Sequence, residues 1–350
     1  MILNGRAYTK KANRRSGIEV NIGGLSLKNS VFLAPMAGIT NLPFRIIVRR
    51  FGCGLAFTEM ISANGLVRGM EKTRRYLDSS DEDRPLGVQI FGQDPAVLAE
   101  AARMVTESGG ADLLDINMGC PVKKVVRAGA GAALMKNPGQ VDLIMKAVRK
   151  ATPLPLTVKL RSGWSRRDIN ALILARIAED DGADAVIIHP RTVDQGFGGE
   201  ADWDVIASLK KHLKIPLVGS GDIRSPDDAL RMLDTTGCDA VMVGRASLGN
   251  PWIFWGIISR LKNEGYPLPT LMEREALIRD HLKMEAAYTG ECRGSRNFRK
   301  HLLWYTKGLR NGARFRQMVG AFSEQEPMLK ELHRFFQSLA ENDEGMSENL

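Results

Sequence analysis

Eight short apolar segments follow one another along the chain, separated by amphipathic stretches, and this alternation constrains the fold more than any other feature. Continuously apolar strands are typical of a parallel sheet that helices cover. Eight strand–helix units within about 230 residues match the usual size of a closed barrel. We therefore predict an α/β fold, a (β/α)8 TIM barrel, with a doubly wound open sheet as the alternative. The predicted strands span residues 31–34, 55–58, 86–90, 111–116, 156–160, 185–189, 215–219 and 240–244.

Local signals predict a hairpin before the barrel and the starts of several helices within it. Residues 18–29 alternate in polarity around Gly23 and Gly24, as a β-hairpin does. Four helices are expected to begin with a side-chain cap followed by proline in the first turn. The cap and proline pairs are Asp94-Pro95, Asn137-Pro138, Ser225-Pro226 and Asn250-Pro251.

The strand signal ends after Arg260, where the organisation of the chain changes. Residues 261–270 contain Gly265, Pro267 and Pro269 and read as a linker. Helical patterns then continue to about residue 340 and predict a small all-α domain. We predict four parts: a disordered basic tail (1–17), the barrel (18–260), the helical domain (261–340) and a disordered acidic tail (341–350).

Positive charge is concentrated in the expected helical domain. The chain carries a net charge of +9 with a pI near 9.4. Cations interleaved with aromatic rings are typical of nucleic-acid binding, whereas a solvated helix face with inward-packed aromatics is the alternative. The cations are Arg293, Arg296, Arg299, Lys300, Lys307, Arg310, Arg314 and Arg316, and the aromatics are Phe298, Trp304, Tyr305 and Phe315.

Cysteine usage and hydropathy exclude several classes of protein. The four cysteines, at 53, 120, 238 and 292, form no C-x-x-C pair and no local cluster with histidine, so neither a disulfide framework nor a metal site is predicted. The sequence has no secretory signal and no apolar stretch long enough to cross a membrane. We expect a cytoplasmic protein without a membrane partner.

Cys120 occupies the most informative position in the chain. Residues 111–116 read as a buried strand, and Gly119 and Pro121 bend the chain directly after it. Catalytic residues of such barrels lie at the carboxyl ends of the strands. A reactive thiol near Lys123 is one interpretation, and a small buried inert cysteine is the other.

Polar or small residues also follow nearly all of the remaining predicted strands. Glycine turns after strands seven and eight match the phosphate-binding place of many barrels. Three roles are open for Lys159: a structural lysine, a Schiff-base lysine or a cation facing a flavin ring. His189 is either a core histidine or a ligand contact. The residues at these exits are Pro35, Met36, Ala37, Gln89, Asn117, Lys159, Arg161, His189, Ser220, Gly221, Asp222, Gly244 and Arg245.

Four motifs resemble the tRNA-dihydrouridine synthase family, and its bacterial B-type branch most closely. They are the segments 34–45 (APMAGITNLPFR), 115–121 (DINMGCP), 158–164 (VKLRSGW) and 243–246 (VGRA). The resemblance spans about residues 20 to 335. It implies an FMN-binding barrel and a helical tRNA-binding domain, which use NADPH to reduce a D-loop uridine.

The resemblance also implies roles for individual residues. Cys120 corresponds to the proton donor. The cofactor contacts fall on Pro35, Met36, Ala37, Gln89, Lys159, His189, Ser220, Gly221, Asp222, Gly244 and Arg245. We assign tRNA contacts to Asn117, Lys123, Arg161, Arg293, Arg296, Arg299 and Lys300. Ser220 stands where the branch has Asn, and Pro190 where it has Gly.

The implied chemistry suits these residue types. FMN would deliver hydride to C6 of uracil, and the Cys120 thiol, still mostly protonated at neutral pH, would protonate C5.

Two alternative functions remain open. One is a flavin enzyme of a free pyrimidine, similar to dihydroorotate dehydrogenase, and the other is an aldolase-type lyase that uses Lys159. No obligate protein partner is expected, and we predict a monomer.

Overall fold

The computed structural model describes residues 19–347, and side chains as far as residue 341. The predicted basic tail, 1–17, lies outside the described residues. The predicted acidic tail does not begin at residue 341, because helix α14 (Gln325–Ser347) continues through it, and residues 348–350 are outside the described part. Extending an existing helix by about two turns costs little, since the nucleus has already formed.

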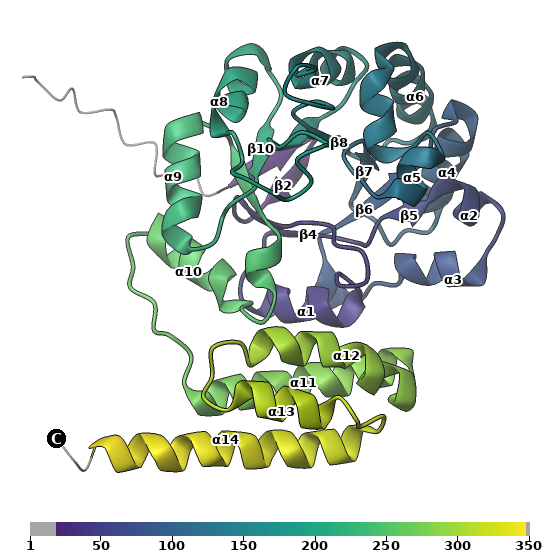
Figure 1. Ribbon diagram of the computed structural model, residues 1–350. Coiled ribbons are helices and arrows are strands. Elements are labelled where there is room, and N and C mark those ends of the chain that lie inside the picture. The colour runs from purple at the N-terminus through teal and green to yellow at the C-terminus, as the bar shows by residue number, and fades with distance from the viewer. Residues whose placement is uncertain (1–18, 348–350) are drawn as a thin grey trace, which may run out of the picture.

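Eight parallel strands form a closed ring, which excludes the open sheet (Figure 1). Closure comes from pairing of β4 with β6 and of β3 with β11, and the short β5 (Ile61–Ser62) adds to β6. All eight predicted strands are present within two residues of their expected bounds. They are β3 (Val31–Leu33), β4 (Leu55–Phe57), β6 (Leu86–Phe91), β7 (Leu113–Asn117), β8 (Leu156–Arg161), β9 (Ala185–His189), β10 (Leu217–Ser220) and β11 (Ala240–Val243).

The predicted hairpin closes the amino-terminal end of the barrel. Its strands β1 (Val20–Ile22) and β2 (Leu25–Leu27) pair antiparallel. Val20, Ile22 and Leu27 join one buried cluster with residues inside the barrel, among them Leu55 and Leu113 at the starts of β4 and β7. A ligand therefore reaches the barrel interior from the opposite end, where the strands finish.

Three of the four predicted helix caps are confirmed. Asp94, Asn137 and Ser225 each accept a backbone hydrogen bond at the start of α4 (Pro95–Glu107), α6 (Pro138–Ala151) and α9 (Pro226–Thr236). The fourth prediction is wrong, because α10 (Trp252–Leu261) begins after Pro251 and has no side-chain cap. The other barrel helices are α1 (Leu42–Arg50), α2 (Ala63–Val67), α3 (Glu71–Arg74), α5 (Lys123–Arg127), α7 (Ala171–Asp180) and α8 (Trp203–His212), with 3₁₀ turns at Arg75–Leu77, Asp81–Asp83, Gly131–Lys136 and Arg245–Ser247.

The carboxyl-terminal helical region consists of α11 (Leu271–Thr289), α12 (Glu291–Tyr305), α13 (Gly312–Val319) and α14. It has its own buried core, which contains Phe298, Tyr305 and Phe315. These three aromatics therefore pack inward and are not free to stack on bases, so the inward-packed alternative holds for them. Trp304 alone of the four is half-exposed.

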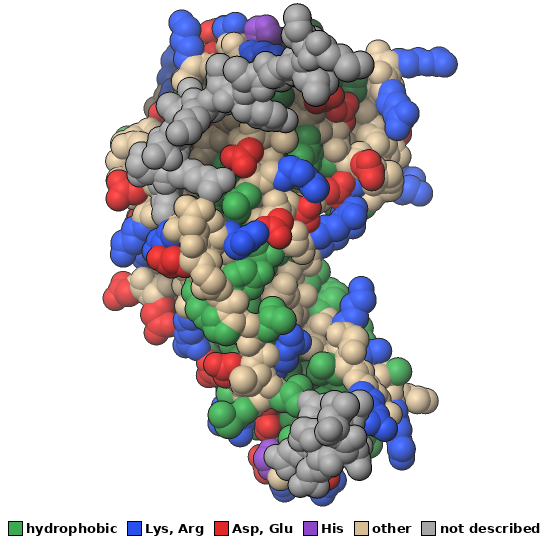
Figure 2. Space-filling view, turned by 90° about the vertical axis from the view of Figure 1, so that its left-hand side faces the viewer, with side chains coloured by type: hydrophobic (Ala, Val, Ile, Leu, Met, Phe, Trp, Pro, Cys, Tyr) green, Lys and Arg blue, Asp and Glu red, His purple; other side chains and the backbone are tan. Residues whose placement is uncertain are grey.

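The helical region lies against one side of the barrel, with α11 and α12 beneath α1 (Figure 1). Polar contacts join the two parts: Asn41 Nδ2 donates to Glu285 at 2.6 Å, and the Tyr288 hydroxyl donates to Asp78 at 3.0 Å. Figure 2 shows a notch on its right-hand edge between the two parts, with Lys and Arg side chains on both sides. Within residues 19–347, no helix has the length and apolarity to span a bilayer.

Candidate active site at the carboxyl ends of the strands

A hydrogen-bond network fixes the turn that carries Cys120. The Asn117 side-chain oxygen, at the end of β7, accepts from the N–H of Gly119 at 3.2 Å and of Cys120 at 2.9 Å. The Asn117 amide donates to Gln89 Oε1 at 2.8 Å, and the Gln89 amide donates to Asp115 at 2.7 Å. Because the side chains of Asn117, Gln89 and Asp115 are buried, the network holds the turn in one position relative to β6 and β7.

The opposite side of the same turn is also held. Arg161 Nε donates to the carbonyl of Gly119 at 2.9 Å, and the N–H of Ala132 donates to the carbonyl of Cys120 at 3.0 Å. Gly131 has a φ of +59°, and a Cβ there would lie 2.9 Å from the Cys120 carbonyl oxygen. The segment after α5 therefore packs directly onto Cys120, and this approach requires glycine.

Cys120 differs from the other barrel cysteines in its exposure. Cys53 and Cys238 are buried, whereas Cys120 is half-buried. Burial raises the pKa of the Cys120 thiol, although a hydrogen bond with the backbone of Val122 and the charges of Arg161 and Lys159 oppose the rise. The thiol is therefore protonated at neutral pH, in the form that donates a proton.

Lys159 lies beside the turn, in register with Asn117 on the neighbouring strand β8. Its ammonium donates no hydrogen bond to any residue of the described chain, and burial lowers its pKa while the Asp115 carboxylate opposes the fall. A half-buried cation without a hydrogen-bond acceptor is suited to an anionic ligand.

Next to β8 around the barrel, the exits of β9 and β10 form a place that fits a bound cofactor. His189 Nε2 is buried and has no hydrogen-bond partner in the described structure. Burial and the nearby charges of Lys159 and Arg161 lower the pKa of His189 to about 2, so the ring is neutral. Gly221 has a φ of +110°, and a Cβ there would lie 3.2 Å from the His189 ring. The unpartnered nitrogen and the glycine beside it leave a polar cradle.

The Asp222 side chain serves the protein itself. Its carboxylate accepts from Arg191 Nη2 at 2.8 Å and from the N–H of Ala201 at 2.8 Å. Burial would raise the pKa of Asp222, but these hydrogen bonds and the charge of Arg191 hold it below its usual value. The carboxylate of Asp222 is therefore already engaged within the protein. Only the backbone groups of this residue are left for a ligand.

The remaining predicted contacts surround the same opening. Pro35, Met36 and Ala37 follow β3 and are half-buried or exposed, and Ser220 is buried at the end of β10. Gly244 follows β11, and a Cβ there would meet only Ala34, at 3.7 Å. The side chain of Arg245 is 58% exposed.

Two residues at the opening were not predicted as site residues. Arg191 is buried and donates to the carbonyls of Gly198 and Gly199, so it shapes the loop after β9. Phe197 in that loop is 60% exposed, and the guanidinium of Arg245 lies 4.9 Å from its ring. The sequence signal that could have identified Phe197 is an aromatic residue within a Gly-Phe-Gly-Gly segment that follows a strand.

The predicted tRNA contacts of the helical region divide into two kinds. Arg293 and Arg296 are exposed and form no ion pair among the residues described. Arg299 instead donates to the carbonyl of Phe322 at 3.1 Å, and Lys300 donates to the carbonyl of Gly38. The sequence does not distinguish the two kinds, because all four are cations on one helix.

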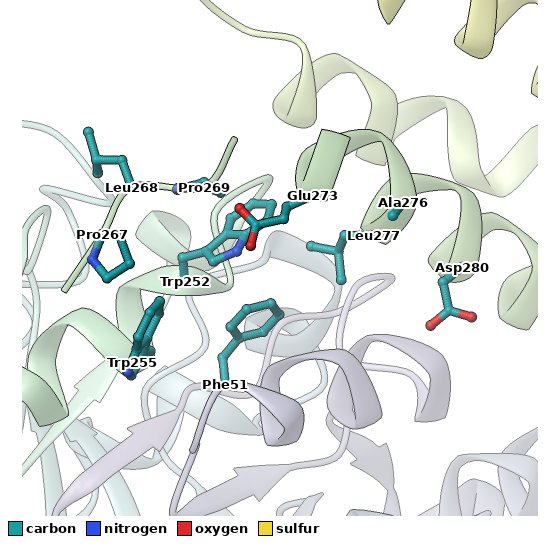
Figure 3. A pocket seen from close by; sticks show the side chains of 10 residues that line it. All are labelled: Phe51, Trp252, Trp255, Pro267, Leu268, Pro269, Glu273, Ala276, Leu277 and Asp280. Atoms are coloured by element: carbon teal, nitrogen blue, oxygen red, sulfur yellow. The ribbon is translucent and has the colours of Figure 1, made fainter. Parts of the chain in front are cut away.

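A hollow of about 450 Å³ lies elsewhere, on the flank of the molecule (Figure 3). Figure 3 shows Trp252 and Trp255 of α10, Phe51 after α1 and Leu277 of α11 around it, with the prolines of the linker. None of its lining residues follows a barrel strand, so this hollow is separate from the site around Cys120.

Comparisons with known proteins agree with this geometry. The chain is 42% identical over 318 residues to tRNA-dihydrouridine synthase B of Pasteurella multocida, covering 91% of this chain and 96% of that protein. It is 39% identical over 329 residues to the protein of the same name from Pseudomonas aeruginosa, covering 94% and 99%.

A solved structure gives the same fold at low sequence identity. Histamine dehydrogenase from Rhizobium sp. 4-9 matches with a TM-score of 0.54 and 15% identity, over 78% of this chain and 51% of that chain. The family model for dihydrouridine synthase (Dus) matches residues 32–341, nearly the whole described chain. The chain therefore belongs to the dihydrouridine synthase family.

Proposed function

We propose that this protein is a tRNA-dihydrouridine synthase that reduces the C5=C6 bond of a D-loop uridine, with FMN as cofactor and NADPH as reductant. The observation that carries the proposal is the half-buried Cys120 residue, which Asn117 holds at the mouth of the barrel and whose thiol pKa is raised by burial. We also propose that it acts as a monomer in the cytoplasm, with tRNA as its partner.

The cradle at the exits of β9, β10 and β11 suits the phosphate and ribityl groups of FMN. His189 offers an unpartnered ring nitrogen, and Gly221, Gly244 and Arg245 offer backbone N–H groups and a cation. Pro35, Met36 and Ala37 would lie along the ring system, opposite Lys159. When bound, FMN would supply the hydride for C6 of the uracil.

Cys120 would donate its proton to C5 of the same base. A protonated thiol held by two backbone contacts can act as a general acid without rearrangement. Lys159 and Arg161 would stabilise negative charge that develops on the base or cofactor. Because a uridine in folded RNA is stacked, it would have to leave the stack to enter this mouth.

Unpaired cations support an RNA substrate. Several cations on the outer barrel helices pair with acids, as Lys146 does with Asp142 at 2.6 Å and Arg260 with Asp227 at 2.6 Å, although Lys150 and Lys211 do not. Around Cys120, exposed cations form no ion pair with a described residue. This rim set consists of Lys123, Lys124, Arg127, Lys136, Arg166 and Arg167.

The rim set and the helical region lie on opposite sides of the mouth. The rim set follows β7 and β8, and β8 is four strands from β3 in both directions around the ring. The helical region docks beside the loop after β3. RNA phosphates would therefore be held on both sides of the base that enters. Neither alternative function, that of a free-pyrimidine enzyme or of a lyase, explains why these cations are present.

Purified protein and tRNA that lacks dihydrouridine test the proposal directly. The protein should be yellow, consume NADPH and form dihydrouridine in the D-loop. Cys120→Ala should keep the colour and lose most turnover, whereas Cys292→Ala, which removes an exposed thiol of α12, should behave as wild type. A colourless protein that takes up no FMN, or full activity in Cys120→Ala, would reject the proposal.

A further inference from the structure

Lys300 reaches from the helical region into the loop that follows the first barrel strand. Its ammonium donates to the carbonyl of Gly38, and the N–H of Gly38 donates to the Glu59 carboxylate after β4. Both polar backbone groups of Gly38 are therefore held by charged side chains, one from each part of the molecule. Gly38 has a φ of +74°, a conformation that favours glycine.

The charge of Lys300 acts on two buried carboxylates at this seam. Glu59 is 8% exposed and Glu285 is 2% exposed. Burial raises the pKa of each, and the charge of Lys300 opposes both rises. Removing one member of such a buried charged group leaves the others uncompensated. Lys300 thus already has partners within the protein, and its role as a tRNA contact stays a prediction.

The turn that Lys300 holds is tight, so a displacement of Gly38 also displaces the neighbouring residues of the turn. The carbonyl of Met36 accepts from the N–H of Ile39 and of Thr40, both at 3.0 Å. The N–H of Met36 donates in turn to the Thr40 hydroxyl at 3.1 Å. Moving Gly38 therefore moves the Pro35–Ala37 segment, to which we assign the cofactor ring.

We infer that Lys300 is a positioning residue that holds the 35–38 turn against Glu59 and so couples the docking of the helical region to the shape of the cofactor site. The inference deepens the proposed function, because it takes the 35–37 segment as part of the FMN site. It predicts that Lys300 affects the affinity for FMN even in the absence of RNA. A phosphate contact would have no such effect.

Lys300→Met removes the ammonium and keeps most of the side-chain length. We expect its affinity for FMN, measured without tRNA, to fall roughly tenfold, as loss of a charge-assisted hydrogen bond predicts. Lys300→Arg keeps a donor and should restore most of the affinity. Lys307→Met is the matched control, because it removes an exposed cation just after the same helix that forms no side-chain hydrogen bond or ion pair with a described residue. That variant should bind FMN as wild type does.

Hydrogen exchange gives a second readout that does not depend on FMN. In the protein without cofactor, Lys300→Met should speed exchange of the backbone amides of residues 36–41, and Lys307→Met should not. Circular dichroism would show whether each variant is folded. Unchanged FMN affinity and unchanged exchange in Lys300→Met, with only a raised KM for tRNA, would overturn the inference. Failure of wild-type protein to bind FMN would reject the proposed function and leave the exchange result to decide the role of Lys300.

Discussion

The Asn117 side-chain oxygen accepts a hydrogen bond from the backbone N–H of Cys120 at 2.9 Å. The same oxygen accepts from Gly119, and the amide of Asn117 is held by Gln89. The residue that ends strand β7 therefore sets the position of the thiol that follows it. The Cys120 thiol is placed by the barrel wall and does not depend on the conformation of a free loop.

Asn117→Ala should lower kcat with little change in FMN content. The substitution leaves two backbone N–H groups and the Gln89 oxygen without partners, and a thiol displaced by about 1 Å can lose roughly a hundredfold in rate. Single-turnover reduction of tRNA, followed with the cofactor already reduced, measures the effect. Asn250→Ala is the control, since Asn250 is exposed and caps no helix. An Asn117→Ala enzyme with wild-type kcat would show that the network is dispensable.

The rate should fall at alkaline pH through ionisation of Cys120. The protonated thiol is the active form, and burial raises its pKa above the ordinary thiol value, so activity should persist through pH 8 and decline only above it. The pH profile of kcat measures this limb. Cys120→Ser should be slow throughout and lose the part of the limb that the thiol causes, because a hydroxyl does not ionise in this range, while the fall from deprotonation of Lys159, whose pKa is lowered to about 8, should remain. A limb below pH 8 in the wild type would contradict the raised pKa.

Removing cations from the rim set should weaken tRNA binding without affecting the cofactor. The Lys123→Ala/Lys124→Ala variant should raise KM for tRNA several-fold and reduce the salt dependence of binding by about two phosphate contacts. Filter binding across a range of salt concentrations measures the slope. Lys146→Ala provides the comparison, because Lys146 is already paired with Asp142. Equal slopes for the double variant and wild type would place the RNA elsewhere.

Gly294→Ala should destabilise the helical region. A Cβ at Gly294 would lie 2.5 Å from Ala286 Cα and 2.6 Å from the Glu285 carbonyl oxygen, so α11 and α12 would have to separate. Overpacking of this kind costs about 1–3 kcal/mol. Urea unfolding measures the loss, with Gly265→Ala as control, because a Cβ at Gly265 meets no atom within 4 Å. Equal stability of the two variants would refute the close-contact argument.

Much of the barrel could be predicted because its signals are local. Runs such as Val31–Leu33 and residues 185–188 are apolar at consecutive positions, and only a strand covered on both faces buries them all. The position of Cys120 was equally readable, since Gly119 and Pro121 mark a turn directly after such a strand. Once the barrel is assumed, every strand exit lies on the same rim.

The sequence could not show interactions that depend on distant partners. Phe298, Tyr305 and Phe315 lie among cations in the sequence, yet they pack against α11 and α14 and form a core. The carboxylate of Asp222 stands at a strand exit but is occupied by Arg191. Nothing near Glu59 in the sequence indicates that it holds the backbone of Gly38.

The sequence by itself determined that the chain forms a barrel and that one thiol stands at its mouth, because strand burial and turn formation depend on neighbouring residues. The tertiary structure alone decided which cations remain free for a ligand. Arg296 and Lys300 are four positions apart on α12, but Lys300 is bonded to a carbonyl 262 residues away. Whether a charge is solvated or paired depends on the elements that pack around it, and only the folded chain brings them together.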